Sequence, residues 1–158
     1  MTRQLHDTGE EYYQDNLSGE SFDIALFADE PGNTGNDLSD RDDLSDITTE
    51  PVNTSTNPDV QYERQTAVFT SSKVNGDWVL TNDSDVVFDV GGSANSGKGN
   101  VATVDSYAII VNFDSDDAGD DGTPSDHLLA TGELSQTYAL GNLDKLTLSA
   151  GGIGTSLS

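Results

Sequence analysis

The sequence predicts an all-β protein, an antiparallel β-sandwich of jelly-roll type with a short N-terminal helical arm. Three observations support this fold class. The apolar residues are gathered into strand-length runs, these runs recur at fairly even spacing, and clusters of Gly, Asn, Asp and Ser separate them. A series of short strands with turn-rich connections is typical of sandwiches and jelly rolls.

The longest apolar run, Thr103–Phe113, predicts the central strand. Within it Ala108, Ile109, Ile110 and Val111 are apolar without interruption. An unbroken run favours a strand that is covered on both faces, because a strand with one wet face alternates apolar and polar side chains. We therefore expect the other strands to lie around this one.

The chain has 158 residues, which is the size of one ordinary domain with a single core. We expect residues 1–20 to form the helical arm and residues 21–158 the sandwich, with a long polar loop at 30–59. The apolar share is 33%, below the ~45–50% typical of globular chains. Together with a net charge of −23 this composition would favour disorder, but disordered acidic chains lack regularly spaced strand runs.

Acidic residues outnumber basic residues by 29 to 6, and they are spread through the predicted loops. Repulsion between them reaches over a Debye length of ~30 Å in dilute buffer but only ~3 Å in molar salt. The composition therefore indicates a salt-rich environment and resembles that of proteins from extreme halophiles and their viruses. It also argues against direct nucleic-acid binding, since no basic patch is present to contact phosphate.

The chain contains no Cys, which excludes disulfides and thiolate metal sites. Its first residues lack the apolar core of a signal peptide, and no apolar run approaches the ~18 residues of a membrane span. We expect a protein that is made in the cytoplasm and has no membrane partner.

The segment Asp7–Gly19 predicts a short helix. Asp7 suits the N-cap, Glu10 follows three residues later in the capping-box position, and Gly19 suits the end of the helix. The helix is too poor in apolar residues to form a core of its own, so it either covers the sheet as a simple lid or contacts a neighbouring subunit. Its apolar residues are Tyr12, Tyr13 and Leu17.

Residues Phe22–Ala28 alternate in the manner of a strand, and the polar stretch at 30–59 follows them. Connections of this length are usually functional or mobile. Part of the stretch, DLSDRDDLSDI, predicts a brief helical turn. The stretch is either a contact between subunits or a solvated loop, and its apolar anchors are Leu38, Leu44, Ile47 and Val52.

Two strand-like segments, Tyr62–Thr70 and Trp78–Thr81, flank the pair Asn75-Gly76, which predicts a tight β-hairpin. Asp85–Val90 predicts the next strand.

The loop after this strand has the spacing of a phosphate-binding loop at Gly92, Gly97 and Lys98. The match fails because Gly99 stands where a Ser or Thr should hold magnesium. A strand-like run then follows, whereas phosphates are bound at the N-terminus of a helix. We expect a loop between strands and no nucleotide site.

The densest acidic loop spans residues 114–126. Asp114, Asp116 and Gly119 match positions one, three and six of a calcium loop, but Ala118 and Ser125 stand where two further ligands belong. We therefore predict a solvated loop that binds no specific divalent ion. The alternative is a structural cation, and its candidate ligands are Asp114, Asp116, Asp117, Asp120 and Asp121.

Residues 126–158 predict two or three closing strands, with turns at Gly141-Asn142 and Gly151-Gly152.

The histidines, His6 and His127, have no spacing that indicates a metal pair. Asp126 and His127 are adjacent, so in a strand they would point to opposite faces, which is wrong for a catalytic relay. No catalytic or cofactor signature is present, and we expect a protein that is not an enzyme and has no cofactor.

Three short motifs occur along the chain: the strand Ala25–Phe27, the Tyr-x-Arg-Gln strand at Tyr62–Gln65, and an LL-x-x-G-x-L hairpin at Leu128–Leu134. Together they resemble small virion structural proteins, capsid decoration or tail-associated proteins, of tailed viruses that infect haloarchaea. The resemblance implies a β-sandwich carried on a head or tail surface, and it implies no catalytic residues.

We therefore expect a non-enzymatic capsid decoration or cement protein that stabilises the shell of a halophilic tailed virus. It would form a homotrimer on the head surface and contact the major capsid protein or other virion proteins. The alternative is a tail-fibre or baseplate module that binds the host surface through Trp78, Tyr12 and Tyr13. The expected oligomer or particle contacts are Tyr12, Tyr13, Leu17, Leu38, Leu44 and Ile47.

Overall fold

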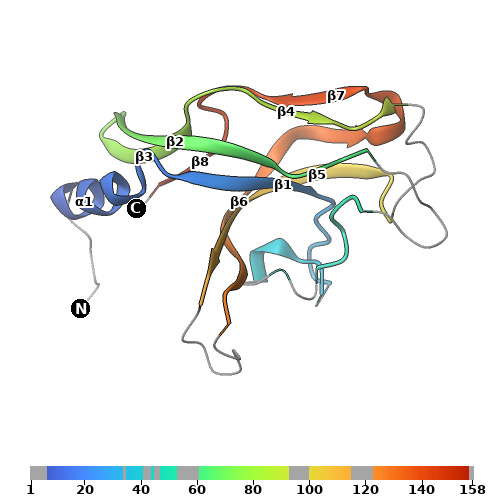
Figure 1. Ribbon diagram of the computed structural model, residues 1–158, viewed down its shortest axis with the longest axis horizontal. Coiled ribbons are helices and arrows are strands. Elements are labelled where there is room, and N and C mark those ends of the chain that lie inside the picture. The colour runs from blue at the N-terminus through green and yellow to red at the C-terminus, as the bar shows by residue number, and fades with distance from the viewer. Residues whose placement is uncertain are drawn as a thin grey trace. The chain divides into compact units, whose positions relative to one another are not determined.

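The computed structural model of this chain describes residues 7–33, 35–40, 44, 47–52, 61–92, 100–114 and 123–156. One α-helix and eight β-strands lie in these ranges (Figure 1). The strand pairs β1–β5, β5–β6, β2–β3 and β3–β8 are all antiparallel. The predicted all-β, antiparallel class with a short N-terminal helix is therefore confirmed.

The chain divides into two compact units. The first consists of Met1–Phe22, Thr66–Val86 and Thr147–Ser158, and the second of Asp23–Gln65 and Val87–Leu146. Strand β1 (Ser21–Phe27) contributes its first two residues to the first unit and the rest to the second.

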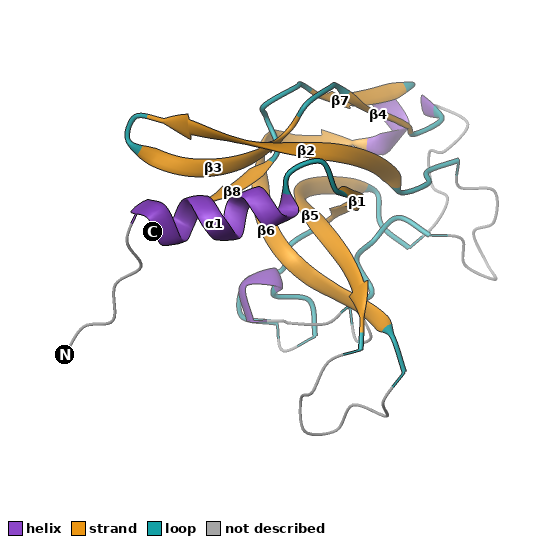
Figure 2. Ribbon diagram, turned by 60° about the vertical axis from the view of Figure 1, so that its left-hand side comes forward, coloured by secondary structure: helices purple, strands orange, loops and turns teal. Residues whose placement is uncertain are grey.

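In the first unit, strands β2 (Gln65–Val74), β3 (Asp77–Asn82) and β8 (Gly154–Ser156) pair in that order. Helix α1 (Asp7–Leu17) contacts β3, and Figure 2 shows it beside that strand. The predicted helix and its end are confirmed, because Gly19 follows with a φ of 86°, in the left-handed region that favours glycine.

The turn between β2 and β3 is the predicted Asn75-Gly76 hairpin. Asn75 has a φ of 54° and Gly76 a φ of 104°. Two successive residues with positive φ are what a two-residue type I′ turn requires, and its twist matches that of the flanking strands.

The core of the first unit forms from alternate strand residues. Ala67, Phe69 and Leu80 are buried, and the ring of Phe22 meets that of Phe69 edge-on with the centroids 5.6 Å apart. Aromatic pairs prefer this arrangement because the positive ring edge faces the negative ring face.

Asn82 is a buried polar residue that ties the C-terminal segment to β3. It is only 2% exposed. Its side-chain Nδ2 donates to the carbonyl oxygens of Ser84 at 2.8 Å and Ser149 at 3.0 Å, and its Oδ1 accepts from the backbone N–H of Ile153 at 2.9 Å. Every polar atom of this side chain is therefore satisfied, and three backbone groups depend on it.

In the second unit, strand β5 (Thr103–Phe113) lies between β1 and β6 (Ser125–Ala139). The predicted bounds of β5 are confirmed, and so is its cover on both faces, because the consecutive residues Ala108, Ile109 and Ile110 are all buried.

The predicted hairpin at Leu128–Leu134 is wrong, because these residues lie inside the single 15-residue strand β6. Gly132 does not form a turn. It pairs with Tyr107 across the sheet, and a Cβ at this position would lie 2.5 Å from the tyrosine ring. The glycine is needed for the close approach of an aromatic ring.

Strands β4 (Val86–Asp89) and β7 (Lys145–Leu148) form a separate two-stranded sheet, and 3₁₀ turns occur at Leu38–Asp40 and Leu140–Asn142. The first of these turns confirms the brief helical turn predicted in the polar stretch. The described C-terminal part of the chain contains three strands, β6, β7 and β8, where two or three were predicted. Within the described ranges, no helix combines the length and apolar character that crossing a lipid bilayer requires.

Replacing Asn82 with Ala should lower the free energy of unfolding by about 2–3 kcal/mol, because it leaves the buried N–H of Ile153 and the part-buried carbonyls of Ser84 and Ser149 without their partner. Denaturant unfolding in molar NaCl measures this. Asn142→Ala, at an exposed position, is the control and should change stability by no more than about 0.5 kcal/mol. An Asn82→Ala protein as stable as the control would contradict the structural role of Asn82.

Candidate interaction surface

Three of the predicted contact residues pack in or against the core of the second unit. Leu38 is 4% exposed and belongs to a cluster with Ala25, Phe27, Ala108 and Ile110. Leu44 and Ile47 are half-buried and pack against this cluster. The side chain of Leu38 therefore serves the core itself, and those of Leu44 and Ile47 partly cover it.

The polar stretch is fastened to the second unit by hydrogen bonds of its own. Asp29 Oδ1 accepts from the N–H of Leu38 at 2.9 Å, and the N–H of Ala28 donates to the carbonyl of Thr49 at 3.1 Å. Asn36 Oδ1 accepts from the N–H of Thr48 at 2.9 Å. These hydrogen bonds fix the described parts of the stretch, and residues 34, 41–43, 45, 46 and 53–60 lie outside the described ranges.

The other three predicted contact residues lie on α1. Tyr13 is 58% exposed and Leu17 is half-buried, whereas the side chain of Tyr12 lies outside the described part of the chain. On the inward side, Gln14 is 2% exposed, and no described group makes a hydrogen bond with its Oε1. A buried amide stabilises the packing of a helix less than an apolar side chain of similar size, because its polar atoms must be desolvated.

Polar contacts attach α1 to strand β2. Ser71 Oγ donates to Asp15 Oδ1, and the N–H of Ser71 donates to Ser18 Oγ at 3.1 Å. The N–H of Gly19 also donates to the carbonyl of Phe69. These hydrogen bonds fasten the C-terminal end of the helix and the residues after it to β2.

Arg64 lies at the centre of a polar network in the second unit. Its Nε and Nη2 donate to the two oxygens of Glu50 at 2.8 Å, and its Nη1 donates to Asp126 Oδ2 at 2.8 Å. The hydroxyl of Tyr62 donates to Glu50 Oε1 at 3.0 Å and accepts from the N–H of Leu26 at 2.9 Å. Burial, and then the charge of Glu50, raise the pKa of Tyr62 far above its usual range, so this phenol stays protonated.

Asp126 and His127 turn to different partners, as strand alternation predicts. Asp126 binds Arg64 and accepts from Asn112 Nδ2 at 2.8 Å. The ring of His127 lies 4.5 Å from the ring of Phe113, and its Nε2 is 3.0 Å from Ser125 Oγ. The predicted absence of an Asp126–His127 relay agrees with this geometry, because the two side chains share no hydrogen bond among the described contacts.

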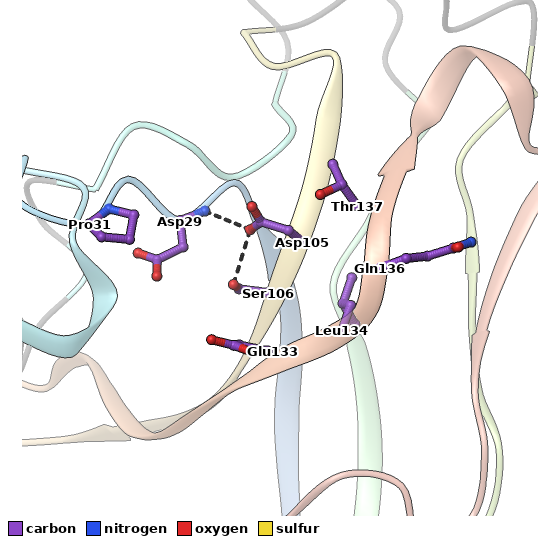
Figure 3. A pocket seen from close by; sticks show the side chains of 8 residues that line it. All are labelled: Asp29, Pro31, Asp105, Ser106, Glu133, Leu134, Gln136 and Thr137. Carbon is purple, nitrogen blue, oxygen red and sulfur yellow. Dashed lines mark hydrogen bonds between the residues drawn. The ribbon is translucent and has the colours of Figure 1, made fainter.

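A cleft of about 250 Å³ opens in the second unit (Figure 3). Figure 3 shows Asp29, Ser106 and Glu133 turned toward one space, and Gln136 turned away from it. Asp105 Oδ1 accepts from the N–H of Asp29 at 2.9 Å and from Ser106 Oγ at 3.0 Å, so it braces the wall of the cleft. The remaining lining residues are Pro31, Leu134 and Thr137.

Within the described residues, no three His, Cys, Asp or Glu side chains are grouped so as to hold a metal ion. Most of the acidic loop, residues 115–122, lies outside the described ranges, and so do residues 93–99 with Gly97 and Lys98, and His6. The predictions for a solvated acidic loop and against a nucleotide site therefore stay predictions. Sequence analysis missed the cleft because its lining comes from three separate segments that share no motif.

No protein-family model, no curated protein and no solved structure matches this chain.

Replacing Asp126 with Asn should lower stability by less than about 1 kcal/mol at neutral pH, because the ion pair with Arg64 is partly exposed. The hydrogen bond from Asn112, and then Arg64, hold the pKa of Asp126 below its ordinary value of 3.8, against the opposing effect of partial burial. A lowered folded-state pKa adds stability that is complete above the ordinary value and is lost as the pH falls through the folded-state value.

Unfolding free energies of the two proteins, measured in molar NaCl from neutral pH to well below 3.8, test this. The two curves should converge at the acid end. A difference in unfolding free energy between the two proteins that stays constant over the whole pH range would show that the charge of Asp126 does not contribute to stability.

Proposed function

We propose that this chain is a non-enzymatic virion structural protein, a capsid decoration or cement protein that assembles as a homotrimer on the head surface and stabilises the shell of a halophilic tailed virus. The observation that carries the proposal is the reversed polarity of helix α1. Its inner face buries Gln14, whereas Tyr13 lies on the outer side with more than half of its surface exposed.

A helix usually turns its apolar side chains toward the core of its own domain. Among the α1 side chains that the structure describes, the buried one is the amide of Gln14, and the ring of Tyr13 lies outside. This arrangement is unfavourable for an isolated subunit but suits an arm that meets a second protein, because aromatic side chains dominate the energetics of interfaces. The arm thus supports a role in assembly.

The charge of the chain supports the halophilic setting. At −23, two copies repel each other over ~10 Å at 0.1 M salt but over only ~3 Å at 1 M. A protein of this kind is suited to assemble in brine, where burial of apolar surface is no longer opposed by long-range repulsion. The virion setting itself is supported by the resemblance of the sequence motifs at Ala25–Phe27 and Tyr62–Gln65, of which the second lies just before β2 and at its first residue.

The alternative, a host-binding tail module, depends on an aromatic platform at Trp78, Tyr12 and Tyr13. Trp78 is half-buried, and the Nζ of Lys73 lies over its ring, 5.9 Å from the centroid. The indole is thus partly covered by its own strand neighbour, and the observations favour the assembly role over a stacking platform for sugars.

Deleting residues 2–17 should give a folded protein that is monomeric and no longer binds its particle, because the deletion removes the contact arm and leaves the strands in place. The assay is co-sedimentation, in about 2 M NaCl where charges are screened, with virus particles that were prepared without this chain.

A second variant, Tyr13→Ser, keeps the helix and should also weaken binding to the particle. Undiminished binding by the truncated protein would reject the role of the arm. Failure of the full-length chain to bind any such particle would reject the proposed function.

A further inference from the structure

The turn between β2 and β3 places the one Asn-Gly pair of the sequence at an exposed point of the first unit. Asn75 and Gly76 are both exposed, and so are all the residues of the range 72–77. A Cβ built on Gly76 would meet no heavy atom within 4 Å. The tip of this hairpin is therefore open to water on the side of the glycine.

The geometry of the turn explains why this pair stands here. The φ of 54° at Asn75 is left-handed, a conformation that Asn tolerates better than most residues, and the φ of 104° at Gly76 disfavours any residue with a Cβ. A two-residue type I′ turn requires both values. The chemical properties of an Asn-Gly pair therefore accompany the hairpin itself.

An Asn that precedes a Gly carries an electrophile beside a nucleophile. The electrophile is the side-chain Cγ, and the nucleophile is the backbone nitrogen of the next residue. Attack of this nitrogen on Cγ closes a five-membered ring, and reactions between groups of one molecule that lie this close are strongly favoured over bimolecular ones. Glycine hinders the attack least, because it has no side chain beside its nitrogen.

The fold leaves both of these groups accessible in the turn. The hairpin ladder pairs Val74 with Asp77, so the N–H of Gly76 is not part of it. Among the described residues, no group accepts a hydrogen bond from the N–H of Gly76, and none holds the side-chain amide of Asn75. Neither reacting group has to be released from a partner before it reacts.

The fold occupies the same groups at other asparagines. The N–H of Asp83, which follows Asn82, donates to the carbonyl of Val68 at 3.0 Å, and the amide of Asn82 is held by three hydrogen bonds. The N–H of Asp37, which follows Asn36, is also committed to a backbone carbonyl at 3.0 Å. These sites must open before they can react, and local opening costs free energy.

We propose that Asn75 is a site of spontaneous deamidation, at which the hairpin is chemically modified with time. The backbone nitrogen of Gly76 attacks Cγ of Asn75 and forms a new C–N bond, and the bond from Cγ to the side-chain nitrogen breaks. The proton of the attacking nitrogen passes through solvent to the leaving nitrogen, which departs as ammonia and leaves a cyclic imide. Water then adds to one of the two imide carbonyls and breaks its C–N bond, so the product is Asp or isoaspartate. This inference does not depend on the proposed virion function.

The two products differ in their effect on the hairpin. An Asp-Gly pair also suits a type I′ turn, so the Asp product keeps the strand register. Isoaspartate directs the main chain through Cγ and lengthens the two-residue loop by one methylene, which disturbs the pair Val74–Asp77 and the adjoining pair Lys73–Trp78. Trp78 is the single tryptophan of the chain, and the Nζ of Lys73 lies 5.9 Å from its ring centroid, so its fluorescence reports on this pairing.

The test is incubation of the folded, full-length chain in molar NaCl at mildly alkaline pH, because the attacking nitrogen reacts after losing its proton. Trypsin cleaves after Lys73 and Lys98, so one peptide contains both Asn75 and Asn82, and mass spectrometry locates the conversion of an amide into a carboxyl group. We expect Asn75 to react at least about tenfold faster than Asn82, and within about tenfold of its rate in a synthetic peptide of residues 73–78. A slower reaction in the folded chain than this would overturn the proposal, since the turn would then keep the two groups apart.

The control variant is Asn75→Gly. A Gly-Gly pair suits the same turn, and it has no side-chain amide to react. On incubation the emission of Trp78 should shift in the wild-type chain as isoaspartate accumulates, and it should stay constant in Asn75→Gly. The isoaspartate fraction is measured with a protease that cleaves before Asp but not before isoaspartate. Accumulation of isoaspartate without a shift, or an equal shift in Asn75→Gly, would overturn the inferred effect on the strand pairing.

Discussion

The negative charge surplus is the constraint on which the rest of this structure depends. With 29 acidic and 6 basic side chains, most carboxylates have no cation to pair with, and solvent and salt must accommodate them. Arg64 forms ion pairs with Glu50 and Asp126 at the same time, and the Tyr62 hydroxyl also donates to Glu50. Removing Arg64 would leave the largely buried carboxylate of Glu50 without its cation, which is costly even where the pair itself adds little.

The acidic surplus leaves few apolar residues for the core, so each unit also depends on hydrogen bonds from polar side chains. Asn82 satisfies three backbone groups in the first unit, and the polar stretch of the second unit is fixed by hydrogen bonds such as that from the N–H of Leu38 to Asp29.

Local signals in the sequence were sufficient for the elements but not for the environment of their side chains. The Asn75-Gly76 turn and the bounds of β5 follow from backbone preference and an unbroken apolar run, which are properties of neighbouring residues. Leu38 was expected at a subunit contact, because no pattern in the neighbouring residues indicates that this polar stretch folds back onto the core of its own unit. Gly132 was expected in a hairpin turn. The reason for a glycine here is the ring of Tyr107, which lies 25 positions away in the chain and becomes a neighbour only through strand pairing. The cleft lined by Asp29, Asp105 and Glu133 was not predicted either, because these residues are far apart in the sequence.

The central claim is that acidic repulsion opposes both folding and association, and that salt relieves it. The most direct measurement is the melting temperature and the oligomer mass of the wild-type chain, by circular dichroism and light scattering, across a NaCl series from ~0.1 to ~2 M, over which the Debye length falls from ~10 Å to below ~3 Å. We predict that both rise together with salt. A melting temperature and an oligomer mass that are the same at both ends of the series would contradict the account.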